Sequence, residues 1–329
     1  MTGRLRLAIA VLTFRRPAEI AACIAAIADH VARTWVDAGG TVVIPSILVV
    51  DNDDRASARS VVEQTASDCP VPVRYLVEPR PGIAAARNRA LDGAVDSDLL
   101  VFIDDDERPT EDWLAPLVET WALTRAAAVM GRVVSVFASP LDPWIAAGEF
   151  FRRRRMPTGT EIAVGAAGNL LLDLAQVRRL GVRFDERLAL GAGEDSLFTS
   201  QLVRAGGRMV WCDESVATDQ VPAERMTRQW VLQRARSHGS TQTVVAVLLA
   251  RSPLRERAIR AQATVGGTVR VLAGGARFMA GRLVGSPRHQ ARGLRTLHRG
   301  LGIAAAAVGV VVQEYARPRH ELASETVHG

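Results

Sequence analysis

The sequence predicts an α/β fold in which a mostly parallel sheet with flanking helices is followed by a helical, basic C-terminal region. Through the first 220 residues, short apolar runs alternate with segments whose apolar residues recur at helical spacing. Such alternation is typical of strands connected by helices. A longer helical pattern runs from Met226 to about Ala250, and beyond it the chain is rich in arginine, glycine and small apolar residues.

Six segments have the composition of buried strands, because each is short and apolar and most are rich in β-branched residues. They are residues 7–14, 47–51, 73–77, 99–103, 128–137 and 209–212. A helix begins at Pro17, since proline is favoured at the first helical position, and another follows Gly82. The residues from Thr110 to Trp113 resemble the start of a further helix.

Charge is distributed unevenly along the chain. The net charge of +6 combines a first 220 residues with 24 arginines and 30 acidic residues and a remainder with 17 arginines, five glutamates and no aspartate. We therefore expect an α/β domain at residues 1–222 and a helical, Arg-rich region at residues 223–329. The three cysteines, Cys23, Cys69 and Cys212, show neither a disulfide pattern nor zinc spacing, which favours a cytoplasmic location.

Polar side chains follow each of the first four predicted strands. In chain order these residues are Thr13, Arg15, Asp51, Asn52, Asp53, Glu78, Asp104, Asp105 and Asp106. Because the carboxyl ends of parallel strands meet at one edge of a sheet, we expect them to line one polar cleft. The three adjacent aspartates repel one another and favour a divalent cation, Mg²⁺ or Mn²⁺, which would hold a phosphate. For any one of these residues, a solvated turn is the alternative.

A second acidic site, Glu194-Asp195, directly follows Gly191-Ala192-Gly193. Glycine permits an unusual backbone turn, and the helical pattern that comes next places the acidic pair near a helix N-terminus. A carboxylate there can act as a general base that takes a proton from an attacking hydroxyl. Helix capping is the alternative role for Asp195.

Several function classes lack their motifs in this sequence. The first predicted strand is followed by LTFRRP, where a dinucleotide-binding dehydrogenase would have GxGxxG, and a P-loop is absent. The same segment lacks the glycine-rich loop of a metal-dependent nucleotidyltransferase, which remains the alternative enzyme class. A sequence pI near 10.3 raises the alternative of a nucleic-acid-binding protein. Few aromatic residues are interleaved with the C-terminal arginines, so we expect no nucleic-acid partner.

The segment from Arg288 to Leu301 has an amphipathic pattern. On a helix, Arg288, Arg292, Arg295 and Arg299 fall in one narrow arc, and Leu294, Leu297 and Leu301 lie opposite. A basic stripe beside a leucine stripe suits an anionic membrane surface, and we expect a peripheral protein on the inner face of the cell membrane. Gly293 and Gly300 weaken the helix prediction, and packing on the rest of the protein is the alternative.

Four motifs, IAVLTFRRP, VVDND, PRPGIAAARNRAL and FIDDDE, occur in this order, and a further matching segment runs from Gly168 to Trp211. With these motifs, from about residue 8 to residue 241, the chain resembles the family 2 glycosyltransferases. The resemblance implies the GT-A type of Rossmann-like fold. It also implies metal-dependent, inverting transfer from a nucleotide-diphosphate sugar, with uridine favoured, to an acceptor hydroxyl in cell-surface polysaccharide or glycolipid synthesis. The basic C-terminal region favours a lipid-linked acceptor.

The resemblance also implies roles for individual residues. The residues expected to bind the nucleotide sugar are Thr13, Arg15, Asp51, Asp53, Arg87, Asp104 and Asp105. Asp106 would bind the metal, and Asp195 would be the catalytic base. Gly168, Asn169 and Glu194 would lie next to the donor sugar and the acceptor. A histidine often follows the last strand in this family as a further metal ligand, and this sequence has Asp219 at the matching position.

Overall fold

The computed structural model describes residues 4–33, 42–188 and 193–310, so the expected turn at Gly191-Ala192 lies outside the described residues. By its internal contacts the chain divides into two compact units. The first consists of Met1–Pro140, Phe151–Ala189 and Glu194–Ala223, and the second of Leu141–Phe150, Leu190–Gly193 and Glu224–Gly329. Residues 141–150 therefore group with the C-terminal helices, which no sequence pattern indicated.

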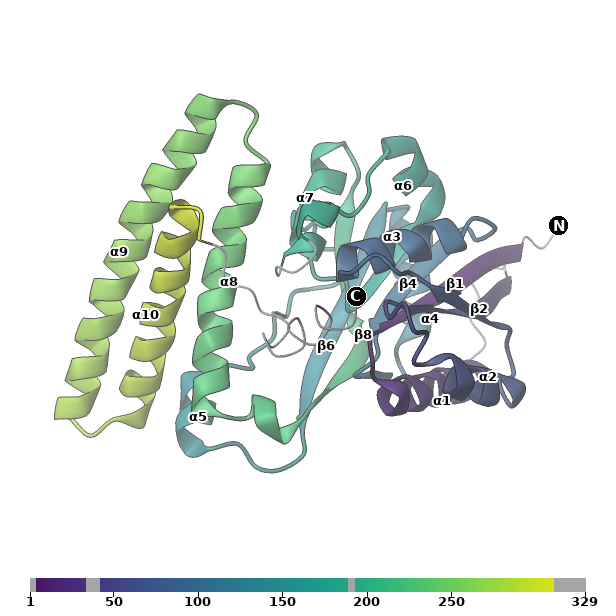
Figure 1. The fold of residues 1–329 in the computed structure, drawn as a ribbon, viewed down its shortest axis with the longest axis horizontal. Coiled ribbons are helices and arrows are strands. Elements are labelled where there is room, and N and C mark those ends of the chain that lie inside the picture. Colours follow the sequence, from purple (N-terminus) through teal and green to yellow (C-terminus); the bar gives the residue numbers. More distant parts are fainter. Residues whose placement is uncertain (1–3, 34–41, 189–192, 311–329) are drawn as a thin grey trace, which may run out of the picture. The chain divides into compact units, whose positions relative to one another are not determined.

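The first unit is built on an eight-stranded sheet with the order β3-β2-β1-β4-β7-β6-β8-β5 (Figure 1). The strands are β1 (Arg4–Thr13), β2 (Val42–Asp51), β3 (Val73–Val77), β4 (Leu99–Asp104), β5 (Glu107–Pro109), β6 (Ala128–Phe137), β7 (Asn169–Asp173) and β8 (Met209–Val221). Strand β1 pairs in parallel with β2 and β4, β2 pairs in parallel with β3, and β6 in parallel with β8. The mostly parallel sheet is confirmed.

Helices cover both faces of this sheet (Figure 1). One core lies beneath α1 (Pro17–Arg33), α2 (Arg59–Ser67) and α4 (Leu114–Thr124), and the other beneath α3 (Ile83–Gly93), α6 (Leu174–Leu180) and α7 (Glu194–Arg204). Successive side chains of β1 serve the two cores in turn, because a strand points alternate residues to opposite faces. Leu7 and Ile9 belong to the first core, and Ala8 and Ala10 to the second.

Several parts of the sequence prediction need correction, and β1 and β2 already begin at Arg4 and Val42, before the predicted residues 7 and 47. Strands β5 and β7 were not predicted, and both pair only in antiparallel fashion: β7 lies between β4 and β6, and β5 lies against β8. The sequence of β7, NLLLD, lacks β-branched residues and runs directly into α6. Strand β8 continues nine residues beyond the predicted end at Cys212, through a polar stretch that pairs with β6. Helix α4 begins at Leu114 rather than at Thr110.

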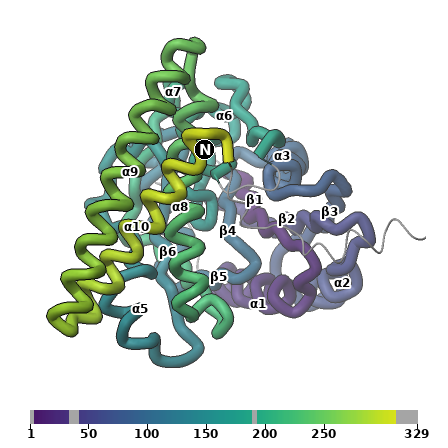
Figure 2. Tube along the Cα trace, turned by 60° about the vertical axis from the view of Figure 1, so that its left-hand side comes forward, coloured from purple at the N-terminus to yellow at the C-terminus, as the bar shows by residue number. Residues whose placement is uncertain are grey.

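The second unit is helical, with α5 (Pro143–Gly148), α8 (Arg228–Leu248), α9 (Pro253–Leu283) and α10 (Pro287–Ala307). Helices α9 and α10 lie side by side (Figure 2). A Cβ atom at Gly293 would lie 2.6 Å from the backbone nitrogen of Phe278, and one at Gly300 would lie 2.7 Å from the carbonyl oxygen of Gly267. The expectation that Gly293 and Gly300 weaken this helix is therefore wrong, because close packing of α10 on α9 requires them.

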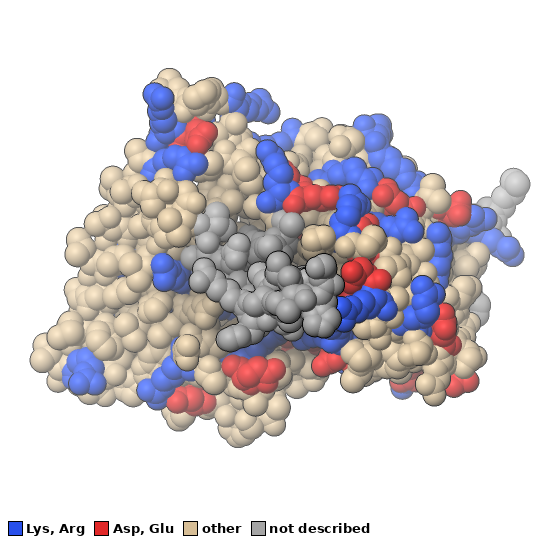
Figure 3. Space-filling view, viewed as in Figure 1, with Lys and Arg blue, Asp and Glu red and all other residues tan. Residues whose placement is uncertain are grey.

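Two of the four arginines in the predicted basic stripe bond to other parts of the second unit. Arg292 pairs with Glu149, and Arg295 donates hydrogen bonds of 2.9 Å to the carbonyl oxygens of Gly148 and Glu149. Much of the visible surface of the second unit carries no charged side chain (Figure 3). Among the described helices, none is both long enough and apolar enough to cross a bilayer.

Candidate active site

The sheet register brings the polar strand ends together at one edge. Thr13 at the end of β1 is the partner of Asp51 on β2, and Leu12 is the partner of Asp104 on β4. Three of the predicted motifs therefore meet at the carboxyl ends of adjacent parallel strands. This edge is where open α/β sheets bind ligands.

Asp105 is buried and tied to the first strand. It accepts a hydrogen bond of 3.0 Å from the Thr13 hydroxyl and one of 2.5 Å from Arg16, whose guanidinium also lies 3.4 Å from Asp106. Burial raises the pKa of Asp105, the charge of Arg16 opposes that rise, and Asp106 adds to it. Thr13 and Asp105, both predicted to bind the nucleotide sugar, are thus brought together and bonded to each other.

Asp51 is fully buried, and both of its carboxylate oxygens accept hydrogen bonds from the protein. One oxygen accepts from the backbone N–H of Asp53 at 3.0 Å, and the other from the N–H of Ala58 at 2.9 Å and the Tyr75 hydroxyl at 2.6 Å. Asp51 therefore holds the turn after β2 in shape. The contact of Asp51 with a nucleotide base stays a prediction.

Arg15 lies next to Asp53 at the same edge of the sheet, at 3.6 Å between Nε and Oδ2. Burial would raise the pKa of Asp53, but hydrogen bonds from Ser57 and Arg55 and the charge of Arg15 lower it. Arg15 has φ of 54°, a left-handed conformation that costs energy for a side chain larger than glycine. This conformation sets the direction in which the chain leaves β1.

The carboxylates of Asp104 and of the buried Glu107 both lie close to Gly168. The Glu107 carboxylate accepts a hydrogen bond of 3.2 Å from the backbone N–H of Asp104. A Cβ atom at Gly168 would lie 2.6 Å from Glu107 Oε1 and 3.2 Å from Asp104 Oδ2, so a larger residue there would displace the Glu107 carboxylate. Desolvation raises the pKa of Asp104 to about 6, with Arg87 opposing the rise and Asp106, Asp105 and Asp195 adding to it. Burial is the main reason that the pKa of Glu107 lies well above its usual value, and the negative charge of Asp104 raises it further.

Arg87 links the two acidic motifs. Its buried guanidinium forms an ion pair with the buried Glu194 and lies 3.9 Å from Asp104. The guanidinium also stacks on the Phe184 ring, 5.5 Å from the ring centroid. Asp195 follows Glu194 in the first turn of α7, where the helix N-terminus favours negative charge. The triple aspartate and the Glu194-Asp195 pair are therefore neighbours in the folded chain.

Asn169 lies in the interior rather than in an open cleft. Its amide oxygen accepts a hydrogen bond of 3.1 Å from Trp113 Nε1, and its amide nitrogen donates to the carbonyl oxygen of Arg132 at 2.9 Å and to Ser215 Oγ at 3.2 Å. These bonds connect β7 to the residue that precedes α4 and to β6 and β8. Asn169 fixes the position of its neighbour Gly168, which itself lies beside the carboxylates.

Asp219 lies directly opposite Glu107 in the pairing of β5 with β8, close to the triple aspartate. Its carboxylate forms an ion pair with Arg153, from the arginine run after α5. Among the described residues, no three His, Cys, Asp or Glu side chains are arranged to hold a metal ion by themselves. The donor chemistry nevertheless suits a divalent cation, because Asp104 and Asp106 supply carboxylate oxygens, the ligands that Mg²⁺ and Mn²⁺ prefer.

Two residues of this site escaped the sequence prediction. Arg16 stands in the motif LTFRRP but was not assigned a role, and Glu107 follows directly on the three aspartates. The unusual fourth acidic residue in DDDE was the available signal for Glu107. Its burial depends on Gly168, which is far away in sequence, so local pattern did not indicate it.

The family model of glycosyl transferase family 2 matches residues 8–173, about half of the chain. The chain belongs to glycosyl transferase family 2. Over 195 residues it is 34% identical to the succinoglycan biosynthesis protein ExoM of Rhizobium meliloti (strain 1021), which covers 59% of this chain and 63% of that protein. The match thus spans less than two thirds of that relative's length.

Solved structures support the fold assignment. The mannosyltransferase PcManGT from Pyrobaculum calidifontis, solved with GDP-Man and Mn²⁺, matches with a TM-score of 0.53 and 18% identity over 99% of this chain and 80% of that one. TarS 1-349 of S. aureus, solved with UDP, matches with a TM-score of 0.52 and 12% identity over 90% of this chain and 92% of that one. The predicted GT-A fold is confirmed.

Proposed function

We propose that this protein is an inverting glycosyltransferase that moves a sugar from a nucleotide-diphosphate sugar, with UDP-sugars favoured, to an acceptor hydroxyl in polysaccharide synthesis. The proposal rests on family membership and on the likeness to ExoM, a protein of succinoglycan biosynthesis. It is also supported by two solved relatives that carry nucleotide ligands, UDP in TarS and GDP-Man in PcManGT.

The observation that supports this function most directly is the ion pair between Arg87 and Glu194. It joins the helix after the PRPG motif to the GED motif, and the same guanidinium lies 3.9 Å from Asp104. In this proposal Asp104 is on the donor side, and Asp195, next to Glu194, takes the proton of the attacking acceptor hydroxyl. A single displacement at the anomeric carbon inverts its configuration and needs no protein nucleophile.

A divalent cation, Mn²⁺ or Mg²⁺, is part of this proposal. Asp106, with Asp104 beside it, would hold the ion together with diphosphate oxygens of the donor, and Asp219 is the further candidate ligand. When bound, such an ion offsets the negative charge that develops on the diphosphate leaving group. The Mn²⁺ present with PcManGT supports the inclusion of a metal.

We place the enzyme at the cytoplasmic face of the cell membrane, with a lipid-linked acceptor. Seventeen arginines against five glutamates after residue 220 support this placement, because an anionic lipid surface attracts such a region. The roles of Thr13, Arg15, Asp53 and Arg87 toward the nucleotide remain part of the same proposal. Each contacts or adjoins the carboxylates at the edge of the sheet.

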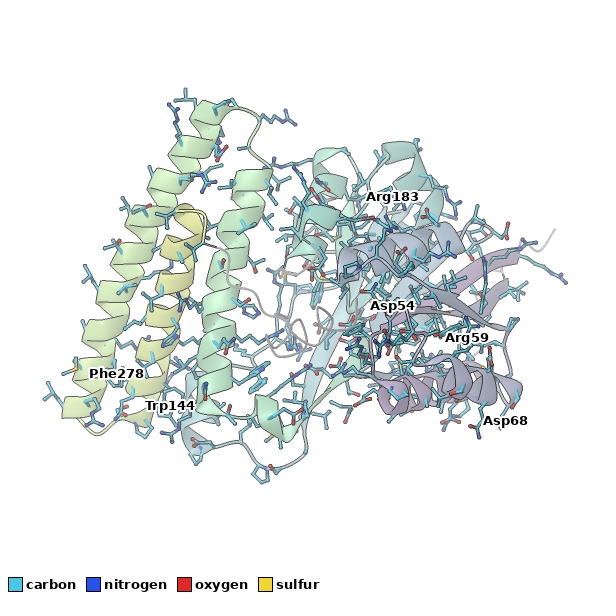
Figure 4. All side chains as sticks on the ribbon, in the orientation of Figure 1. Asp54, Arg59, Asp68, Trp144, Arg183 and Phe278 are labelled. Carbon is cyan, nitrogen blue, oxygen red and sulfur yellow. The ribbon has the colours of Figure 1, made fainter. Side chains whose placement is uncertain are left out.

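The test starts from a thermal-shift screen of UDP-, GDP- and dTDP-sugars with and without Mn²⁺, since a ligand that binds only the folded protein raises the melting temperature. With the donor identified, Asp195→Asn is expected to abolish sugar transfer while nucleotide binding survives. The exposed Asp68, at the end of α2 (Figure 4), provides the matched control Asp68→Asn. Transfer at the parent rate by Asp195→Asn would exclude Asp195 as the base.

Product analysis separates this function from the nucleotidyltransferase alternative. A glycosyltransferase releases a nucleoside diphosphate, whereas a nucleotidyltransferase releases pyrophosphate from a nucleoside triphosphate. Pyrophosphate release with a sugar phosphate and a triphosphate as substrates would overturn the proposal. Release of a nucleoside diphosphate that depends on an added acceptor would support it.

A further inference from the structure

Helix α9 exposes a row of large apolar side chains to solvent. Of these side chains, Leu254 is 78% exposed, Leu272 67% and Leu283 84%, and the row is completed by Val265, Val269 and Met279, each more than half exposed. At 100° per residue, these six positions fall within an arc of about 80° on the helix. The alanines that share the arc, Ala258, Ala261 and Ala276, are exposed as well. We call these nine residues the α9 apolar stripe.

The opposite side of α9 is the one that packs within the second unit. Gly267, Gly274 and Gly281 are buried there, and a Cβ atom at Gly274 would lie 2.5 Å from the backbone nitrogen of Leu297 on α10. The glycine contacts fix the rotation of α9 about its axis. The α9 apolar stripe therefore points away from α10, along a helix of 31 residues or about 46 Å.

Arginines border the α9 apolar stripe. Helix α9 contains six arginines and one acidic residue, Glu256, which pairs with Arg260 on the same helix. Arg257 and Arg282 flank one side of the stripe and Arg255 the other, and all three are exposed. A helix with an apolar face and arginines at its margins has the composition of one that lies in the plane of a bilayer surface.

We propose that the α9 apolar stripe is the membrane-docking face of this protein and that it takes up an anionic lipid surface. The leucines, valines and methionine enter the acyl boundary, and the flanking arginines bind lipid phosphates. A second copy of the chain is a poorer occupant, because pairing two such stripes would set arginines against arginines. The proposal rests on the membrane placement proposed above, but it moves the contact from the stripe on α10 to α9.

The experiment measures binding of the purified full chain to vesicles, without donor or acceptor. Vesicles of phosphatidylcholine alone are compared with vesicles of phosphatidylcholine and phosphatidylglycerol by co-sedimentation. The variants Leu272→Ser with Leu283→Ser and Arg257→Gln with Arg282→Gln test the two parts of the face. Leu123→Ser, at an 87% exposed leucine on α4, and Arg179→Gln, at an exposed arginine on α6, are the matched controls.

We expect the parent protein and both controls to bind the anionic vesicles and to dissociate from them at high salt. The double arginine variant should lose about fivefold in affinity for the anionic vesicles for each arginine removed, and the double leucine variant about tenfold in all. The circular dichroism of both variants should match that of the parent. Parent-like binding by both α9 variants would overturn the α9 assignment and leave the membrane placement standing. A parent that binds no anionic vesicle would overturn both. If the parent protein forms a dimer and binds no vesicles, and if the α9 variants alone are monomeric, the α9 apolar stripe is an interface with a second copy of the chain.

Discussion

Removing the Arg87 side chain is the most direct test of how the two acidic motifs are joined. The paired side chains of Arg87 and Glu194 are only 5% and 7% exposed. Arg87→Met preserves much of the side-chain volume but leaves Glu194 buried without its cation. Breaking a buried pair by removing one partner costs about 3–5 kcal/mol, a large fraction of the roughly 5–15 kcal/mol that stabilises a typical domain.

The assay is urea unfolding at neutral pH, arranged as a double-mutant cycle with Glu194→Gln. Because Gln is neutral, we expect the double variant to recover part of the stability that Arg87→Met loses. Arg183→Met is the matched control: the ion pair of Arg183 (Figure 4) with Asp92 is about half exposed on both sides, and it should contribute no more than about 1 kcal/mol. Equal losses for Arg87→Met and Arg183→Met, or strict additivity in the cycle, would refute the reasoning.

Three further predictions concern stability. Gly274→Ala should lower the free energy of unfolding by about 1–3 kcal/mol, because the added Cβ would meet the backbone of α10. Gly266→Ala on the same helix should raise the free energy of unfolding by up to about 1 kcal/mol. Equal urea midpoints for the two variants would contradict this. Because the pKa of Glu107 is raised in the folded protein, the stability that Glu107 contributes is complete below about pH 4.5 and is lost as pH rises above it, so Glu107→Gln should flatten the fall in the free energy of unfolding with rising pH; an unchanged slope would contradict this. Tyr75→Phe should cost about 1.5–3 kcal/mol by removing a hydrogen bond to Asp51, with nucleotide affinity unchanged; weakened affinity at full stability would point to a direct role.

Strands β3 and β6 were predictable because their pattern is local. Residues 73–77 and 128–137 form β3 and β6 with the predicted bounds, since β-branched runs between turns are typical of strands. Strand β7 is different, because its leucines suit a helix equally well. Only pairing with β4 and β6 decides that this segment is extended.

The C-terminal region illustrates the same limit. Its amphipathic pattern at Arg288–Leu301 does form a helix, but the pattern does not say which neighbour covers each side. Arg292 and Arg295 bond to the end of α5, more than 140 positions away in the chain, and the glycines of α10 meet α9. A longer row of exposed apolar side chains lies on α9, which the sequence pattern did not single out.

By itself, the sequence determined the α/β class, the acidic strand ends, the GED motif and their order along the chain, because strand and helix periodicity and motif spacing are local properties. The tertiary structure decided how these carboxylates differ. Asp105 is held by Thr13 across 92 positions and Glu194 by Arg87 across 107, while Glu107 is buried against Gly168. Burial and long-range pairing set the charge of a carboxylate, and both arise only when the chain has folded.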